Sequence, residues 1–93
     1  MAKNFSHNGL VVSFKSRAIE CNDYSVYERA TAETRVIHKF DDGRFERTGA
    51  DASARDVAAV QAFIEADKAE FRAWLAANPD LQAAYAKLSV GGV

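Results

Sequence analysis

Residues 38–47 read HKFDDGRFER, and this stretch decides how the first half of the chain folds. At its centre, Asp42-Gly43 is a two-residue turn signal, because glycine accepts the positive φ of a primed turn. Apolar and charged residues alternate on both sides, as in strands that bury one face. The stretch therefore predicts a β-hairpin with a two-residue loop.

That loop length sets the register of the two strands. Phe40 is expected opposite Phe45, and the neighbouring pairs, among them Lys39 with Glu46, join opposite charges. A slip of one residue would lose these pairs, since it turns every side chain to the other face. The face expected to lie on the core carries Val36, His38, Phe40, Phe45 and Arg47. The outer face carries Arg35, Ile37, Lys39, Arg44 and Glu46.

Working back from the hairpin, residues 10–21 alternate like a strand. Ala18-Ile19 shifts the apolar phase, which predicts a bulge near Ser16, and Asn22-Asp23 is a turn signal. Residues 24–34 are open to two interpretations. Tyrosine, valine and threonine favour a strand, whereas Asp23 as N-cap would start a short helix.

Beyond Gly49 the chain becomes rich in alanine and helical in period. Ser53 followed by Asp56 resembles a capping box, with Asp51 as an alternative cap, so a helix is expected from residue 53 to about 77. Asn78-Pro79 ends this helix and starts a short second one, with Asn78 as N-cap and Pro79 as first helical residue. Residues 89–93 are expected to fray.

The long helix has two apolar sides. One side is expected to pack on the sheet and consists of Val57, Val60, Ile64, Phe71, Trp74 and Leu75, with Phe63 at its edge. The other side is made of alanines, namely Ala58, Ala62, Ala66, Ala69, Ala73 and Ala77. An alanine face can simply be exposed, because alanine is the best helix former. It can equally contact the second helix, or a second copy of the chain in a homodimer.

Strands first and helices after predict an α+β fold: one two-layer domain over residues 1–93. In it, an N-terminal antiparallel sheet of three or four strands packs on the long helix, with a short C-terminal helix beside it. No stretch approaches the apolar length of a membrane span, and the N-terminus lacks the pattern of a signal peptide. We therefore expect a cytoplasmic protein that does not contact a membrane.

We searched the sequence for motifs of catalysis and cofactor binding and found none of them. A phosphate-binding glycine loop, GxSxG and HExxH are all absent. Cys21 is the only cysteine, and together with His7 and His38 it falls short of the four N/S ligands of a structural zinc site. We expect no enzyme, no catalytic residue, no cofactor and no metal.

His38 and Asp67 are polar residues at positions where apolar ones are expected. A buried carboxylate needs a partner, so Asp67 is predicted to meet Arg47 or His38 in a structural polar pair. The alternative places Asp67 beyond the sheet, in water.

The outer sheet face is expected to carry basic residues that could contact a partner, namely Lys15, Arg17, Arg35, Lys39 and Arg44. Basic residues around apolar ones can bind RNA or single-stranded DNA, but the formal net charge of −1 argues against a strong phosphate binder. The expected function is that of a small non-catalytic protein that binds another protein, as an inhibitor or accessory subunit, of the kind that phages and operons encode. A nucleic-acid-binding accessory domain is the alternative.

Overall fold

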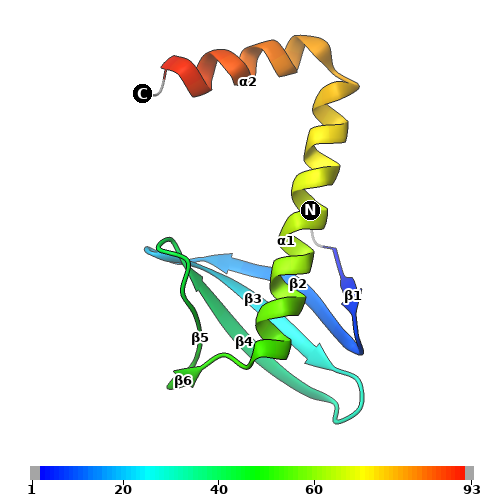
Figure 1. Cartoon of the computed structure of the whole chain (residues 1–93), viewed down its shortest axis with the longest axis vertical. Coiled ribbons are helices and arrows are strands. Elements are labelled where there is room, and N and C mark those ends of the chain that lie inside the picture. Colours follow the sequence, from blue (N-terminus) through cyan, green and yellow to red (C-terminus); the bar gives the residue numbers. More distant parts are fainter. Residues whose placement is uncertain (1–2, 92–93) are drawn as a thin grey trace.

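The computed structural model describes residues 3–91, which form one antiparallel sheet and two helices (Figure 1). The six strands follow one another in the sheet in chain order. The strands are β1 (Phe5–His7), β2 (Leu10–Arg17), β3 (Cys21–Glu28), β4 (Glu33–Phe40), β5 (Phe45–Arg47) and β6 (Ala50–Asp51), and the helices are α1 (Ala54–Ala76) and α2 (Pro79–Gly91). Neither helix is long and apolar enough to cross a membrane.

This architecture confirms the α+β class, the antiparallel sheet and the pairing of a long helix with a shorter C-terminal one. The predicted number of three or four strands is wrong, because the sheet has six. Its edge strands β1 and β6 have three and two residues, which is too short for an alternating pattern to reveal them.

The core lies between α1 and one face of the three long strands. Leu10, Val12, Val26 and Ile37 supply the sheet side of this core and are all fully buried. From α1, Ala59, Val60 and Phe63 pack against them. Residues 24–28 belong to β3, which confirms the strand interpretation. The chain then turns at residues 29–32, where Ala32 has a φ of 56°.

The hairpin of β4 and β5 exists, but its predicted register is wrong by one residue. Lys39 lies opposite Phe45 and His38 opposite Glu46. The Phe40 N–H donates to the Arg44 carbonyl (2.8 Å), which leaves a loop of residues 41–43 that ends in Gly43 at a φ of 97°. A three-residue loop whose last residue is glycine with positive φ is the next common hairpin connection after the two-residue one.

The longer loop also corrects the predicted faces of β4. Phe45 packs against the core, whereas Phe40 and His38 lie on the sheet face away from α1. Ile37, expected outside, is fully buried. Arg35 shares the α1 side with Ile37 and is therefore not on the outer face.

The first strand is shorter than expected. β2 ends at Arg17, and the Ala18 N–H donates to the Cys21 carbonyl (2.8 Å) to close a tight turn whose Ile19 is 94% exposed. Asn22-Asp23, expected to turn, lies inside β3. The predicted bulge near Ser16 is confirmed, since the β2–β3 register shifts between Phe14 and Ser16.

The helix boundaries agree with the sequence except at the C-terminus. Ser53 caps α1 and accepts the Asp56 N–H (3.1 Å). The Asn78 carbonyl accepts the Leu81 and Gln82 N–H groups of α2, both at 3.0 Å, while its side-chain amide donates back to the Trp74 carbonyl (2.6 Å). α2 continues to Gly91, where a frayed tail had been expected from residue 89, and residues 92–93 of that tail lie outside the described residues.

A buried ion pair fixes the start of α1 to the sheet. Asp56 is 1% exposed, and its carboxylate accepts two hydrogen bonds from the Arg35 guanidinium, at 2.7 and 2.8 Å. Arg35 also pairs with Glu28 (3.0 Å), which in turn pairs with Arg55 of α1 (3.0 Å). These contacts raise the pKa of Arg35, with Asp56 as the main cause.

We expect Arg35→Met to lower the free energy of unfolding by about 3–5 kcal/mol, because the variant leaves a buried carboxylate without its cation. Urea denaturation measures this. The double variant Arg35→Met/Asp56→Leu should regain much of the loss, since it removes both charges. A single-variant cost below about 1 kcal/mol, the value of an exposed pair, would contradict this role.

The Glu28 contacts predict a pH dependence. Hydrogen bonds from Arg55 and then Arg35 hold the pKa of Glu28 below its ordinary value of 4.5. A carboxyl group with a lowered pKa in the folded state stabilises the fold above its ordinary pKa, and this contribution is lost as pH falls through the lowered value. The stability difference between wild type and Glu28→Gln should be constant from about pH 7 to 5 and shrink below about pH 4.5. A difference that does not change down to about pH 3 would show that Glu28 makes no such contribution.

Candidate functional site

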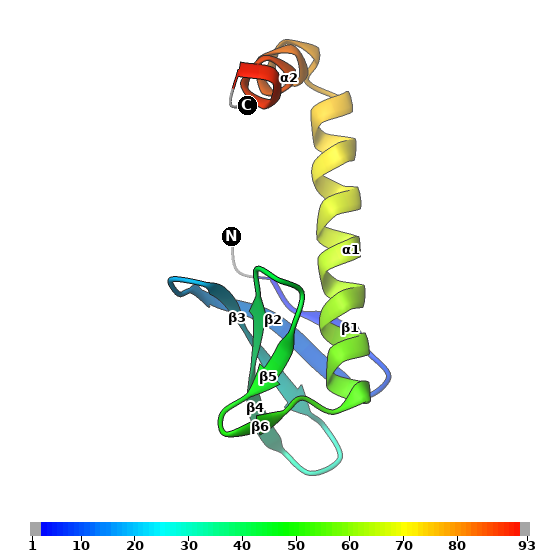
Figure 2. The ribbon, with the colours of Figure 1, turned by 60° about the vertical axis from the view of Figure 1, so that its left-hand side comes forward.

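The stripe of α1 that packs on the sheet continues beyond the sheet. Asp56, Ala59, Val60 and Phe63 are its buried members, at the helical spacing of three and four residues. The same face continues through positions 67, 71 and 74, but no residue of α1 after Phe63 is buried. At 1.5 Å per residue the 23-residue helix is roughly 35 Å long, and only its first turns have a sheet to cover. Figure 2 shows α1 continuing past the strands, with α2 turned back from its end.

Phe71 and Trp74 are therefore not core residues, which corrects the sequence-based expectation that they pack on the sheet. They are 44% and 46% exposed. The Phe71 ring lies near Trp74 (5.9 Å between centroids) and meets Tyr85 of α2 edge-on (5.5 Å). Leu81 and Tyr85 of α2 are also exposed, at 40% and 45%. We call α1 from Ile64 onward, together with α2, the helical arm.

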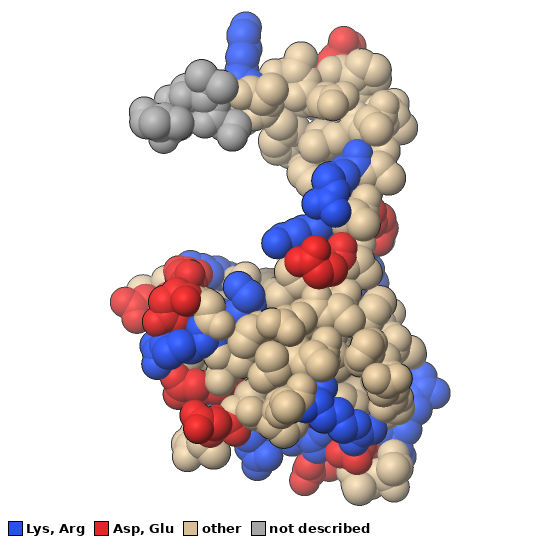
Figure 3. Space-filling view, viewed as in Figure 1, with Lys and Arg blue, Asp and Glu red and all other residues tan. Residues whose placement is uncertain are grey.

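A groove of 570 Å³ lies where the helical arm leaves the sheet. Figure 3 shows the molecule hollowed between α2 and the sheet, alongside α1. The apolar lining consists of Phe14, Tyr24, Phe63, Ile64, Phe71 and Trp74. The charged lining consists of Lys3, Asp67, Lys68 and Glu70.

The polar residues predicted to pair have different partners in the structure. Asp67 lies at the groove with its side chain 57% exposed, and it pairs with Lys3 (3.0 Å), which also contacts Glu70. His38 binds Asp23 (2.6 Å), and Arg47 lies on β5 opposite Ile37. The expected contact of Asp67 with Arg47 or His38 is thus replaced by separate contacts.

The five basic residues expected to contact a partner do not form one patch. Arg35 is held under α1 by Asp56. Arg17 makes two hydrogen bonds to Asp41, each of 2.8 Å. Lys15 is exposed beside the bulge of β2, and Lys39 is half-buried at the end of β4.

Arg44 is the fifth of these residues, and it lies at the hairpin loop over the Phe40 ring, 4.4 Å from its centroid. It pairs with Asp42 (2.9 Å) and Glu46 (2.7 Å). Acidic partners thus offset three of the five positive charges, which weakens the case for phosphate binding.

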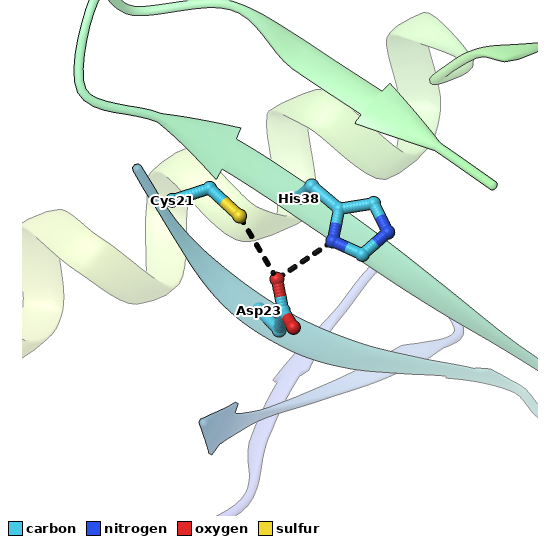
Figure 4. Close-up of side chains that lie close together, drawn as sticks. All are labelled: Cys21, Asp23 and His38. Carbon is cyan, nitrogen blue, oxygen red and sulfur yellow. Dashed lines mark hydrogen bonds and ion pairs between the residues drawn. The ribbon is translucent and has the colours of Figure 1, made fainter. Parts of the chain in front are cut away.

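A second cluster of reactive side chains lies on the sheet face away from α1 (Figure 4). Asp23 and His38 are directly opposite each other on β3 and β4, and Cys21 precedes Asp23 by two residues, on the same face. One oxygen of Asp23, Oδ1, contacts both neighbours: the Cys21 thiol donates to it (3.3 Å), and it binds His38 Nδ1 (2.6 Å).

The electrostatics of this cluster are set by its own contacts. The hydrogen bond with His38 lowers the pKa of Asp23. Burial, followed by the hydrogen bond to Asp23, raises the pKa of the Cys21 thiol. Cys21 is 7% exposed, and its thiol stays protonated at neutral pH.

These contacts do not make a catalytic cysteine. A nucleophilic thiol needs a base beside its sulfur and a lowered pKa, but here the carboxylate lies between sulfur and imidazole, and the thiol pKa is raised. What the cluster does offer is three donor atoms, a sulfur, an oxygen and a nitrogen, all within 4.8 Å of one another.

Sequence reasoning missed this cluster because it counted only cysteine and histidine as metal ligands and assigned Asp23 to a turn. The signal that was available is Cys-x-Asp, which places both side chains on one face of a strand. His38 could join them only once the β3–β4 register was known.

No protein-family model, curated protein or solved structure matches this chain. Any function must therefore be argued from the groove and the cluster themselves.

Proposed function

We propose that the protein acts without catalysis, by binding another protein in the groove beneath its helical arm, as an inhibitor or accessory subunit. The observation that carries this proposal is the apolar stripe of α1, which resumes at Phe71 and Trp74 where the chain has no sheet left to bury them. Large aromatic side chains contribute strongly to protein–protein interfaces.

The exposed surface of the chain supports this proposal quantitatively. A compact monomer of 10.2 kDa has an accessible surface of about 5,300 Å². This chain has 6434 Å², an excess of roughly 1,100 Å². A standard interface buries about 800 Å² on each partner, so the excess is of the size that one partner would cover.

The stability of isolated helices also indicates a missing contact. α2 has 13 residues, and a helix of that length is marginal in water without tertiary packing. The aromatic contacts of Phe71 with Tyr85 and Trp74 join the two helices, but they leave all three rings about half exposed. A partner in the groove would bury the Phe71 and Trp74 rings and so stabilise the arm.

The shape and charge of the groove favour an amphipathic helix as the bound segment. The groove lies between α1 on one side and β2 and β3 on the other, and its apolar lining would receive the side chains of a helix at spacings of three and four residues. The charged lining holds two positive and two negative residues, and Lys3 pairs with both Asp67 and Glu70. Recognition would therefore depend mainly on apolar contact.

The test uses Trp74→Glu, which places a charge in the groove without touching the core. We expect wild type to retain one protein from host lysate in stoichiometric amount after nuclease treatment. That protein, once purified, should bind wild type and lose at least about a hundredfold in affinity for the variant, the scale of a hot-spot residue. Ile19→Glu is the matched control, since Ile19 is 94% exposed in the β2–β3 turn and does not line the groove.

Other outcomes would contradict the proposal. A partner that binds Trp74→Glu as tightly as wild type does not use the groove. If nuclease treatment removes the proteins that wild type retains from lysate, the nucleic-acid alternative would be favoured.

A second copy of the chain is the competing partner, and it would contact a different side of the arm, because Ala66, Ala69 and Ala73 are exposed on the side opposite the groove. If another protein is the occupant, sedimentation at micromolar concentration should give a monomer, and Ala69→Glu should not change it. A dimer that Ala69→Glu dissociates would assign the arm to self-association.

A further inference from the structure

We propose that Cys21, Asp23 and His38 form a zinc-binding site on the sheet face away from α1 and the groove. The inference does not rest on the proposed function, because it uses different residues on the opposite face of the sheet. It assigns the ion three protein ligands: the thiolate Sγ, a carboxylate oxygen and His38 Nδ1.

Two of the three spacings between the donor atoms are close to those around a small tetrahedral ion. With Zn–S near 2.3 Å and Zn–N and Zn–O near 2.1 Å, neighbouring donors in a tetrahedron lie about 3.4–3.6 Å apart. Cys21 Sγ and Asp23 Oδ1 are already 3.3 Å apart. Asp23 Oδ1 and His38 Nδ1 are 2.6 Å apart, so they would separate by less than about 1 Å as the ion replaces their hydrogen bond.

The backbone holds these ligands in place before any ion binds. Asp23 and His38 are cross-strand neighbours within the β3–β4 ladder, two pairs in from its end. Next to Cys21, the Asp41 N–H donates to the Glu20 carbonyl (3.0 Å). The Arg17–Asp41 ion pair also joins the end of β2 to the loop that follows β4. A site on paired strands loses little conformational entropy when it binds a ligand.

Charge and exposure are compatible with a cation. Arg17 is neutralised by Asp41, which leaves Lys15 as the cation whose field reaches Asp23. The side chains of Asp23 and His38 are 17% and 27% exposed, so solvent reaches the site. Three protein ligands with access to water leave the fourth position of the ion to a water molecule, as in open zinc sites.

The donor set selects the metal. A thiolate with an imidazole suits zinc and its spectroscopic substitute cobalt, whereas calcium and magnesium require oxygen ligands. Binding releases the thiol proton to solvent, and the His38 ring carries its remaining proton on Nε2. The protein gains one metal–sulfur, one metal–oxygen and one metal–nitrogen bond, with no change in oxidation state.

The experiment titrates Co²⁺, and then Zn²⁺, into the untagged, reduced, metal-free full chain. We expect one equivalent of Co²⁺ to produce the near-ultraviolet thiolate charge-transfer band and the visible bands of a tetrahedral ion, and Zn²⁺ to displace it. The thermal midpoint should rise with Zn²⁺, because only the folded chain holds the three ligands together.

The variants separate this site from adventitious binding. Cys21→Ser should abolish the charge-transfer band, and Asp23→Asn and His38→Gln should each weaken binding by roughly a hundredfold or more, since loss of a supporting residue alone costs 10–100-fold. His7→Gln, which removes the other histidine, is the matched control and should bind like wild type. Circular dichroism shows whether each variant is folded.

Two results would overturn the inference. One is the absence of a thiolate band in folded wild type at millimolar Co²⁺. The other is an affinity for Zn²⁺ that Asp23→Asn and His38→Gln, both folded, leave unchanged.

Discussion

The rest of the structure depends on how the first three turns of α1 are attached to the sheet. The Arg35–Asp56 ion pair and the packing of Val60 and Phe63 position the helix on β2, β3 and β4. Once this part is fixed, the direction of α1 is fixed too, and a straight helix of 23 residues must extend past a sheet narrower than itself. The exposed aromatic rings, the groove beneath them and the large surface of the chain all follow from that mismatch of lengths.

Local patterns in the sequence were sufficient to predict the elements of the fold. The Ser53 cap, the alanine-rich helix and the Asn78-Pro79 junction were read correctly, because capping and period are properties of neighbouring residues. Edge strands of two or three residues are too short to show a period, and the hairpin register depended on a loop of three residues where Asp42-Gly43 suggested two. Because of this one additional loop residue, Ile37 lies in the core where His38 was predicted. For the same reason Arg35, which was predicted on the outer face, lies in the buried ion pair. Long-range pairs such as Asp23 with His38 depend on register, and so they could not be predicted from the sequence.

The two faces of the sheet serve separate purposes in this account. On the α1 side, the buried charged groups form ion pairs, and the apolar stripe of α1 ends in the groove. On the opposite side, the strand alternation brings a thiol, a carboxylate and an imidazole to one point without a helix to cover them. The proposal of protein binding rests only on the first face and the zinc site only on the second, so either can fail alone.

If the helical arm is incomplete until a partner protein covers it, hydrogen exchange of the free chain in dilute solution will distinguish the arm from the core. Amides in the part of α1 that packs on the sheet should exchange slowly. Amides of α1 beyond Phe63 and of α2 should exchange orders of magnitude faster, because few buried contacts hold them. Their exchange should slow down when the purified partner is added. If the amides of the arm were as protected as those of the core in the isolated monomer, the arm would be complete by itself and the account would be wrong.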